Sequence, residues 1–573
     1  MAWFEEAIFY HIYPLGLTGA PKKNDYGEPV SRLTQLAPWI EHVKEIGCNA
    51  VYIGPLFESV GHGYETTDYK KLDSRLGTNE DLKKFVTDCH NMGIRVILDG
   101  VFNHTGRDFF AFKDMQKNRE NSQYKDWYCN VNFYGNTEYN DGFSYENWGG
   151  YNLLVKLNQQ NPQVREYIAD VIRFWVKEFD IDGIRLDAAD VLDFSFMKML
   201  RAVANEVKED FWLMGEVIHG DYNKWANDET LHSVTNYQLH KALYSGHNDH
   251  NYFEIAHTVK RLYEMFSGSG VKLYNFVDNH DVERINTKLQ NKNHFTCVHI
   301  MLYTLPGIPS LYYGSEYGID GRKERGSDDS LRPCLNIKEM PGENEKLSLI
   351  SKLAKIRKQY PVLAAGSFEE LRLTNRQYVF ARAEGENRIY IAVNNDEAGC
   401  ELCFPVRKAG NYVGLLSGKV YRAEGDMLHV SLPPESGEIW LEEGLRQTLA
   451  EKESIRVKTA EKKTIIEKQE QEAETRLERE AAERQQREQE EKARLEREAA
   501  ERQQREQEEK DSPKREEWAV IDRSKSYEEM SIQELQAVIY EKMAKNGPVT
   551  DRMKQDILEN VYHNSLVTWA KSF

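Results

Sequence analysis

Four short segments in the first half of the chain each follow an apolar run and carry acidic or imidazole side chains. They are Asp99-Gly-Val-Phe-Asn103-His104, Gly183-Ile-Arg185-Leu-Asp187, Gly215-Glu216-Val-Ile-His219 and Phe276-Val-Asp-Asn279-His280-Asp281. If each run is a strand of one parallel barrel, these side chains meet at its carboxyl face. Cleavage of an acetal needs two carboxyl groups that face one bond, one charged and one protonated. Asp187, Glu216 and Asp281 can supply such groups from three strand ends.

Short β-rich runs alternate with amphipathic stretches from about residue 7 to 360, which is typical of repeated βα units. We therefore expect an α/β fold, a closed (β/α)8 TIM barrel made of residues 1–103 and 161–360. The eight expected strands are Ile8–Tyr13, Ala50–Gly54, Val96–Val101, Gly183–Leu186, Trp212–Gly215, Ser233–Asn236, Leu273–Phe276 and Ser310–Tyr312.

Two further segments depart from the βα pattern before residue 445. Residues 104–160 show no helix of the usual kind and are rich in aromatic residues, so we expect an inserted subdomain after the third strand. Its aromatic residues are expected mainly in the core of that subdomain. Residues 361–444 show short alternating runs separated by Gly, Asn and Pro, which predicts a C-terminal antiparallel β-sandwich domain. Its expected strands are Gln377–Ala383, Arg388–Asn394, Glu401–Pro405, Tyr412–Leu416 and Glu438–Leu441.

The segment 445–512 is built mostly of Glu, Arg, Lys, Gln and Ala, and Arg476–Lys492 recurs intact as Arg494–Lys510. The offset of about 18 residues equals about five helical turns, so equivalent side chains share one face. A solvated helix with i,i+4 Glu–Arg pairs is favoured, with a coiled coil and disorder left open. Residues 513–573 return to amphipathic helix patterns at Ile532–Ile539 and Ile557–Tyr562, and two helices of this size rarely hold a core alone. Packing on the rest of the chain, self-association and docking to a protein partner all remain open for 445–573.

The composition of the chain limits which binding partners and which cellular compartment are expected. The net charge of −18 argues against nucleic acid and anionic membranes. No apolar run approaches the ~20 residues that span a bilayer. The first residues do not resemble a secretion signal, and seven scattered Cys fit reduced thiols. We therefore expect a cytoplasmic protein.

Residues 1 to about 444 resemble the α-amylase family of glycoside hydrolases, because the four segments match that family's motifs in the same order. A fifth segment, Leu154-Val-Lys-Leu-Asn158, is similar to the short motif at the end of the family's inserted subdomain. Within the family, the motifs are most similar to those of the cyclomaltodextrinase, neopullulanase and maltogenic amylase group. The resemblance does not extend to residues 445–573.

The resemblance implies a role for each acid of the cluster. Asp187 would be the nucleophile of a retaining double displacement, and Glu216 the general acid and then the base. Asp281 would bind sugar hydroxyls and favour the distorted transition state. Arg185 lies two residues before Asp187 on the same strand face, so its guanidinium can keep that carboxylate ionised and oriented.

The resemblance also implies a set of sugar-binding residues. Tyr64 would stack on the sugar beside the scissile bond, while Asp99 would be a structural acid at the barrel mouth. The other matches are His104 and His280 for sugar hydroxyls, Asp328 and Arg332 for the next sugar, and His219, which is as well explained by a structural role. No organic cofactor is implied. Asn103 matches a calcium ligand of some members, so calcium is left open.

These features favour a hydrolase of α-1,4 bonds in maltodextrins or cyclodextrins, with an α-glucan oligosaccharide as its ligand. Ala188 after the expected nucleophile is a weak indication for α-1,4 rather than α-1,6 bonds. The first alternative is a 4-α-glucanotransferase, in which a sugar hydroxyl replaces water as the acceptor. The second is a tethered, non-catalytic barrel, against which the presence of all three acids argues.

Overall fold

The computed structural model describes residues 2–342, 344–446, 476, 479–481, 483–502 and 518–573. The chain divides into two compact units, Met1–Val457 and Lys458–Phe573, and each is considered by itself. Within the described ranges, every helix is too short or too polar to cross a lipid bilayer.

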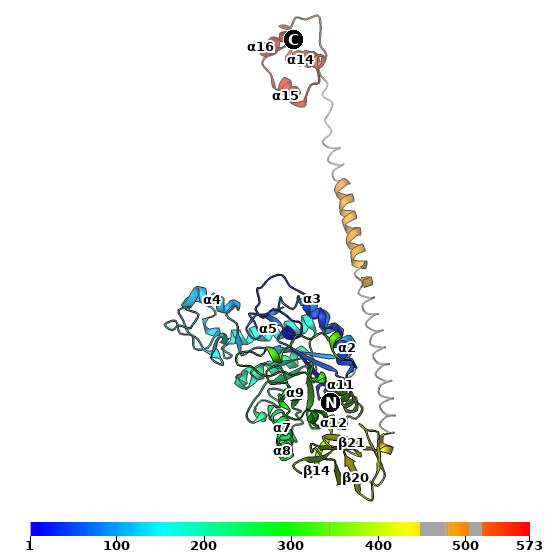
Figure 1. The fold of residues 1–573 in the computed structure, drawn as a ribbon. Coiled ribbons are helices and arrows are strands. Elements are labelled where there is room, and N and C mark those ends of the chain that lie inside the picture. The colour runs from blue at the N-terminus through cyan, green and yellow to red at the C-terminus, as the bar shows by residue number, and fades with distance from the viewer. Residues whose placement is uncertain (1, 343, 447–475, 477–478, 482, 503–517) are drawn as a thin grey trace. The chain divides into compact units, whose positions relative to one another are not determined.

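The first unit contains the expected eight-stranded parallel barrel, drawn from blue to green in Figure 1. Its strands pair in the order β11-β10-β9-β5-β2-β1-β13-β12. A further parallel bridge between Thr235, just after β11, and Tyr274 in β12 joins the two ends of the sheet, so the barrel is closed. The strands are β1 (Phe9–Ile12), β2 (Ala50–Ile53), β5 (Arg95–Gly100), β9 (Gly183–Leu186), β10 (Trp212–Gly215), β11 (Ser233–Val234), β12 (Tyr274–Phe276) and β13 (Ile308–Tyr312).

Amphipathic helices cover the outside of the barrel. In α5, for example, Asn161 caps the first turn, Pro162 occupies the first helical position, and Ile168, Ile172 and Trp175 are buried toward the strands. The larger helices of this layer are α2 (Ala37–Glu45), α3 (Asn79–Asn91), α5 (Pro162–Phe179), α6 (Phe194–Val207), α7 (Tyr237–Asn248), α8 (Tyr252–Phe266), α10 (Phe295–Thr304) and α11 (Glu345–Gln359), with the short α1 (Pro14–Leu17), α9 (Ile285–Lys288) and α12 (Val362–Ala365) between them.

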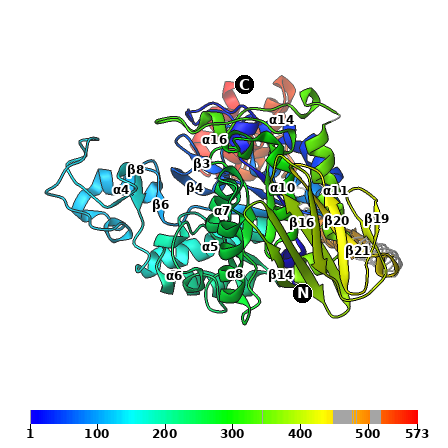
Figure 2. The same ribbon diagram turned by 60° about the horizontal axis from the view of Figure 1, so that its bottom comes forward.

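The insertion between β5 and α5 projects to one side of the barrel, in light blue in Figures 1 and 2. It pairs β6 (His104–Thr105), β8 (Tyr151–Lys156) and β7 (Asn147–Trp148) in one small antiparallel sheet. It also contains α4 (Phe110–Asn118), which corrects our expectation that no regular helix lies here. The buried face of α4 is limited to Ala111, Phe112 and Met115, too few positions to stand out as a helical repeat. Before the insertion, β3 (Phe57–Ser59) and β4 (Thr66–Leu72) form a separate hairpin.

The C-terminal β domain contains the five predicted strands and three more. One sheet has the order β14-β15-β16-β21-β18-β19 and a second pairs β17 with β20. Tyr390, Phe404, Leu428 and Trp440 pack between them. The opposite face of the larger sheet is covered by α10 (Figure 2). The strands are β14 (Ser367–Leu373), β15 (Gln377–Glu384), β16 (Asn387–Asn394), β17 (Cys400–Pro405), β18 (Asn411–Gly414), β19 (Val420–Arg422), β20 (Met427–Leu432) and β21 (Ser436–Glu442).

The second unit contains part of the charged repeat and a small helical module. The described residues between 476 and 502 are helical and exposed, with i,i+4 pairs such as Arg494–Glu498 at 3.4 Å. The rest of the predicted repeat helix lies outside the described residues. The C-terminal helices enclose their own core of eight buried residues, including Leu535, Ile557 and Leu566, which two helices alone were not expected to hold. They are α14 (Ile532–Asn546), α15 (Asp551–Glu559) and α16 (His563–Ser572), of which α16 was not predicted.

Candidate active site

The side chains predicted to carry the chemistry converge at the carboxyl ends of neighbouring barrel strands. Asp99 lies near the end of β5, Asp187 follows β9 directly, and Glu216 follows β10 directly. Parallel pairing sets Asp99 beside Arg185, and Arg185 beside Met214 of the next strand. Sequence-distant carboxyl groups are therefore brought together by strand register.

Arg185 is the centre of this cluster. Its Nη1 lies 2.9 Å from Oδ1 of Asp99 and 2.9 Å from Oδ1 of Asp187. Its Nη2 lies 2.8 Å from Oε2 of Glu216. Arg185 is 3% exposed, Asp187 7% and Glu216 9%, so the three carboxyl groups share one guanidinium in a largely buried setting.

Burial and the neighbouring charges shift the pKa of Asp187 and of Arg185. Burial raises the pKa of Asp187 well above its usual value, the charge of Arg185 opposes this, and the charges of Glu216 and Asp99 add to it. Burial alone would lower the pKa of Arg185, but the surrounding carboxylates hold it well above its usual value. Asp187 therefore holds a proton more readily than an isolated carboxyl group would, with Arg185 working against this.

The chain between these two acids contributes a backbone donor. Ala188 has φ 46° and ψ 43°, a left-handed conformation that is uncommon for a residue with a Cβ. Its N–H donates to Oε2 of Glu216 at 3.2 Å. The hydroxyl of Tyr237, at the start of α7, donates to Oε1 of Glu216 at 3.1 Å and accepts from the amide of Asn279 at 3.3 Å. Both carboxylate oxygens of Glu216 are thus oriented by the protein.

Asp99 is held at the back of the cluster by two tyrosines. The hydroxyls of Tyr52 and Tyr64 donate to its Oδ2 at 2.8 and 3.2 Å. Gly54 makes room for it, because a Cβ at that position would collide with the Cβ of Asp99. These contacts fit the structural role that the sequence suggested for Asp99.

Asp281 belongs to a second, more exposed group of charges. Its carboxylate lies 3.0 Å from Nε2 of His280 and 2.8 Å from Nη2 of Arg332. Arg332 also contacts Asp328 at 3.1 Å. Although burial raises the pKa of Asp281, the charges of His280 and Arg332 outweigh it and hold the pKa well below its usual value. Asp281 is therefore ionised at neutral pH.

Tyr64 and His104 line the same region from the loop side. The hydroxyl of Tyr64 is hydrogen-bonded to Nε2 of His280, and the two rings are stacked with centroids 5.8 Å apart. His104 is buried, its Nε2 bonded to the carbonyl of Tyr64 at 3.1 Å, and burial lowers its pKa to about 3. His104 is therefore neutral. The loop is fixed by Glu65, whose carboxylate accepts from the backbone N–H of Gly63 at 3.2 Å.

Two predicted site residues lie apart from the cluster. His219 is exposed three residues after Glu216 and makes no hydrogen bond with any residue in the described parts of the chain. Asn103 is fully buried, with its side chain bonded to Gln159 and His104. Calcium prefers about six to eight oxygen ligands that include carboxylates, and neither partner is one. No group of three or more His, Cys, Asp or Glu suited to a metal occurs among the described residues, so calcium stays a prediction.

Sequence reasoning missed several residues of this site. Tyr13 packs over His280, its hydroxyl donates to the carbonyl of His62 at 2.6 Å, and the guanidinium of Arg332 lies 4.7 Å from its ring centre. Tyr52 and Tyr237, described above, were also missed. A signal was available, because all three tyrosines lie at or next to the carboxyl ends of predicted strands. The ammonium of Lys323, 3.1 Å from the carbonyl of Asp281, comes from a loop that offered no such signal.

Taken together, the geometry provides a buried carboxyl pair with one shared cation, an ionised third acid, and a surround of tyrosine and histidine. Such a pair can present one charged and one protonated group to the same bond. The neighbouring aromatic and hydrogen-bonding side chains suit a ligand that has both apolar faces and many hydroxyls.

Comparison with known proteins points to the same chemistry. A model of the α-amylase catalytic domain matches residues 33–346. A cyclomaltodextrinase of Bacillus sp is 31% identical over 424 residues, covering 70% of this chain and 74% of that protein. A maltogenic α-amylase of Bacillus acidopullulyticus is 30% identical over 422 residues, covering 70% and 71%. A solved cyclomaltodextrinase structure is similar with a TM-score of 0.68 at 27% identity, covering 76% of this chain and 78% of that one.

Proposed function

This chain belongs to the α-amylase family of glycoside hydrolases, and on that premise we propose that it hydrolyses α-1,4-glucosidic bonds with retention of configuration. Its substrates are maltodextrins and cyclodextrins, as the names of the similar cyclomaltodextrinase and maltogenic α-amylase suggest. The observation that carries the proposal is the Asp187–Glu216 pair on the single guanidinium of Arg185.

In the first step, Asp187 attacks the anomeric carbon while Glu216 protonates the leaving oxygen. The bond from carbon to Asp187 forms as the glycosidic bond breaks, and the aglycone departs with the proton of Glu216. The second step reverses these roles, because Glu216 then takes a proton from water as the water displaces Asp187. The short span that Arg185 bridges supports the close carboxyl spacing, about 5 Å, of a retaining enzyme.

The remaining residues are assigned to binding and positioning. Asp281, kept ionised by His280 and Arg332, accepts hydrogen bonds from sugar hydroxyls beside the reacting carbon. Tyr64 offers its ring to the sugar face, and Asp328 with Arg332 contacts the next sugar. Tyr237 is a positioning residue, since its hydroxyl orients the carboxyl group of Glu216.

A cytoplasmic location is also proposed. All seven cysteines of the chain are free, including Cys48, Cys89 and Cys297, which are buried. Reduced thiols are typical of proteins that work in a reducing compartment.

The deciding experiment is a product analysis with the full-length protein. Maltotriose, β-cyclodextrin, pullulan, soluble starch and isomaltose are compared as substrates, and the product anomer is followed by NMR from the first turnovers. We expect α-configured products from maltotriose and β-cyclodextrin and none from isomaltose. Early accumulation of oligomers longer than maltotriose would favour the glucanotransferase, and β-configured products would contradict the mechanism.

A further inference from the structure

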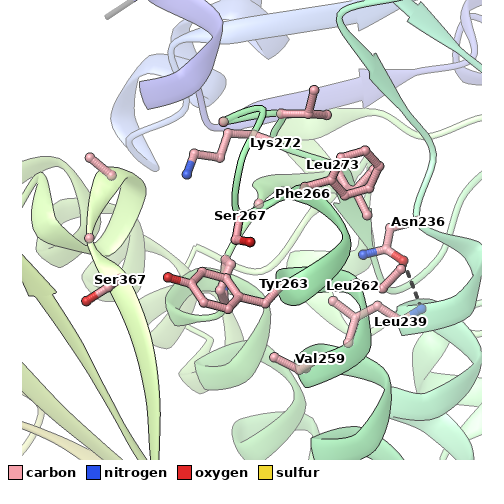
Figure 3. Close-up of a pocket in the computed structure, with 16 residues that line it drawn as sticks. Asn236, Leu239, Val259, Leu262, Tyr263, Phe266, Ser267, Lys272, Leu273 and Ser367 are labelled. Carbon is pink, nitrogen blue, oxygen red and sulfur yellow. Dashed lines mark hydrogen bonds between the residues drawn. The ribbon is translucent and has the colours of Figure 1, made fainter. Parts of the chain in front are cut away.

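A second pocket lies away from the carboxylates, beside the residues that lead into β12 and β13 (Figure 3). Its walls come from α8 and the loop after it, from Pro306 and Gly307, and from the segment 365–367 that enters the C-terminal β domain. Its volume of about 340 Å³ is at the lower end of the range for small-molecule sites, roughly 300–1,000 Å³. A ligand of this pocket would therefore be small.

The ammonium of Lys272 in this pocket is without a partner. The side chain is half-buried, and its Nζ makes no hydrogen bond or ion pair with any residue that the structure describes. Burial and the charges of Arg382 and Arg357 lower the pKa of Lys272, and only Glu5, beyond ion-pair distance, opposes them. A half-buried ammonium with positive neighbours is an unfavourable arrangement unless an anion compensates it.

The two guanidiniums lie directly behind the pocket wall. Nη2 of Arg357 donates to the carbonyl of Gly307 at 2.6 Å, and Nη2 of Arg382 donates to the carbonyl of Gly366 at 2.7 Å. Burial lowers their pKa to about 10 and about 9, so both are still protonated at neutral pH. Their other hydrogen bonds also go to backbone carbonyls, which solvate a cation without neutralising its charge.

The lining itself supplies hydroxyl groups and an apolar wall but no carboxylate. Figure 3 shows the ammonium of Lys272 and the hydroxyl of Tyr263 extending toward the side of the pocket where Ser367 lies. Ser267 adds a third hydroxyl, and Leu262 belongs to the apolar wall. The hydroxyls of Ser267 and Ser367 donate to backbone carbonyls at 3.1 and 3.0 Å, so toward a ligand they act as acceptors. The pocket thus combines excess positive charge with donors and acceptors suited to a polyol.

We propose that this pocket binds a small phosphorylated sugar, with the phosphate at Lys272 and the sugar hydroxyls at Tyr263, Ser267 and Ser367. The charge of Lys272 with the field of the two buried guanidiniums selects the anion, and the hydroxyls select the polyol. The site is separate from the carboxylate cluster, because none of Asp187, Glu216 and Asp281 lines it.

The test is isothermal titration of the full-length protein with glucose 6-phosphate, inorganic phosphate and glucose as three separate probes. We expect glucose 6-phosphate to bind, inorganic phosphate to bind at least tenfold more weakly, and glucose to be weaker still. Lys272→Met should weaken glucose 6-phosphate about tenfold, the loss of one charge-assisted contact. Added NaCl should weaken it too, because the attraction is electrostatic.

Two control variants test whether the binding depends on Lys272 and on the sugar hydroxyls. Lys260→Met removes an exposed charge from α8, the helix that precedes Lys272, and should leave the dissociation constant unchanged. Tyr263→Phe removes one hydroxyl and should weaken glucose 6-phosphate but not inorganic phosphate. Failure of glucose 6-phosphate to bind at 10 mM, on the order of a weak small-molecule affinity, or an unchanged affinity in Lys272→Met, would overturn the proposal. Equal affinities for the two phosphates would overturn the sugar part of it.

Discussion

The two ends of the barrel each carry buried charged side chains, and these charges are compensated in different ways. At the carboxyl ends of the strands, Asp99, Asp187 and Glu216 share the one guanidinium of Arg185. Around the residues that precede the strands, Arg357 and Arg382 are bound by backbone carbonyls alone. Burial raises the pKa of Asp187 within the first cluster, whereas the two guanidiniums of the second stay charged and crosslink the chain. Under the proposed function, the first end carries out the chemistry and the second secures the fold.

The largest expected effect comes from the acids themselves. Asp187→Ala should lower kcat on maltotriose by about 10⁴-fold or more, because no nucleophile remains. Glu216→Ala should lower it by roughly 10²–10⁴-fold. α-Maltosyl fluoride separates the two roles, since fluoride leaves without a proton. Initial rates should show that Glu216→Ala forms the glycosyl enzyme from the fluoride and Asp187→Ala does not.

Glu229→Gln is the matched control for these substitutions, because Glu229 is an exposed acid paired only with Lys198. Its kcat should equal that of the unaltered protein. If Asp187→Ala turned over the fluoride at the rate of Glu216→Ala, the assignment of the two roles would be wrong.

Arg185→Lys tests whether the shared guanidinium is needed at the chemical end. An ammonium cannot bridge three carboxyl groups, so kcat/KM should fall by roughly 10²–10³-fold. Arg185 lowers the pKa of Asp187, so a weaker cation there raises that pKa. The acidic limb of the pH–rate profile should therefore move to higher pH. A profile that stays in place would show that Arg185 does not set this ionisation.

Arg357→Lys is the corresponding change at the other end. It should destabilise the protein by about 1–3 kcal/mol, because some of the carbonyls bonded to Arg357 lose their donor. Activity per folded molecule should stay the same. Urea unfolding with parallel assays measures both quantities. A loss of kcat in the folded variant would remove the distinction between the two ends.

A smaller effect is expected from Asp182, which lies at the start of β9 while Asp187 follows its end. Burial raises the pKa of Asp182, but hydrogen bonding and charge from His90, with the charge of Lys208, hold it well below the usual value. A depressed folded-state pKa gives stability that is present above about pH 4 and is lost as the pH falls through the folded value. Asp182→Asn should be less stable at pH 7 and lose less on acidification.

This difference is measured by urea unfolding at several pH values between about 3 and 7, across the unfolded-state pKa. Asp180→Asn is the control, since Asp180 is mostly exposed. Equal acid slopes for Asp182→Asn and the unaltered protein would mean that this carboxylate is not linked to folding.

The smallest effect is expected from the C-terminal unit. A chain that ends at residue 446 retains the whole carboxylate cluster, so its kcat/KM on maltotriose should be within about twofold of the full chain. The comparison of oligomeric state and binding partners of the two chains then shows what residues 447–573 contribute. A truncated protein that folds but is inactive would show that residues 447–573 are needed for catalysis.

The carboxyl end of the barrel was far more predictable than the opposite end. Strand ends are marked in the sequence by a switch from apolar to acidic residues, which located Asp187, Glu216 and Asp281. No comparable pattern indicates that Arg357 is buried, because an Arg in an amphipathic helix is usually expected at the surface. Its burial depends on α11, α12 and the loop before β13 meeting in space. Tyr237 differs from Arg357, since it lies next to a predicted strand end, although its contact with Glu216 joins two neighbouring strands.

Two strands of the C-terminal β domain, β14 and β20, were also not predicted, for different reasons. Strand β14 holds Glu369, Glu370 and Arg372 in a partly exposed ladder, so it lacks an apolar alternation. Strand β20 has that alternation, with Leu428, Val430 and Leu432 buried, and could have been found. Whether residues 445–512 associate as a coiled coil stays a prediction.

The left-handed turn at Ala188 gives residue 188 an influence that its small side chain does not suggest. A β-branched residue would resist this conformation at a cost on the order of 1 kcal/mol or more, and the peptide plane would tend to rotate. Rotation would swing the N–H away from Glu216 and leave that oxygen with Arg185 as its remaining partner, so the carboxyl group would turn toward the guanidinium. Any preference for one linkage that is associated with this position would then act by re-aiming the proton donor, with no need for the side chain to touch the sugar.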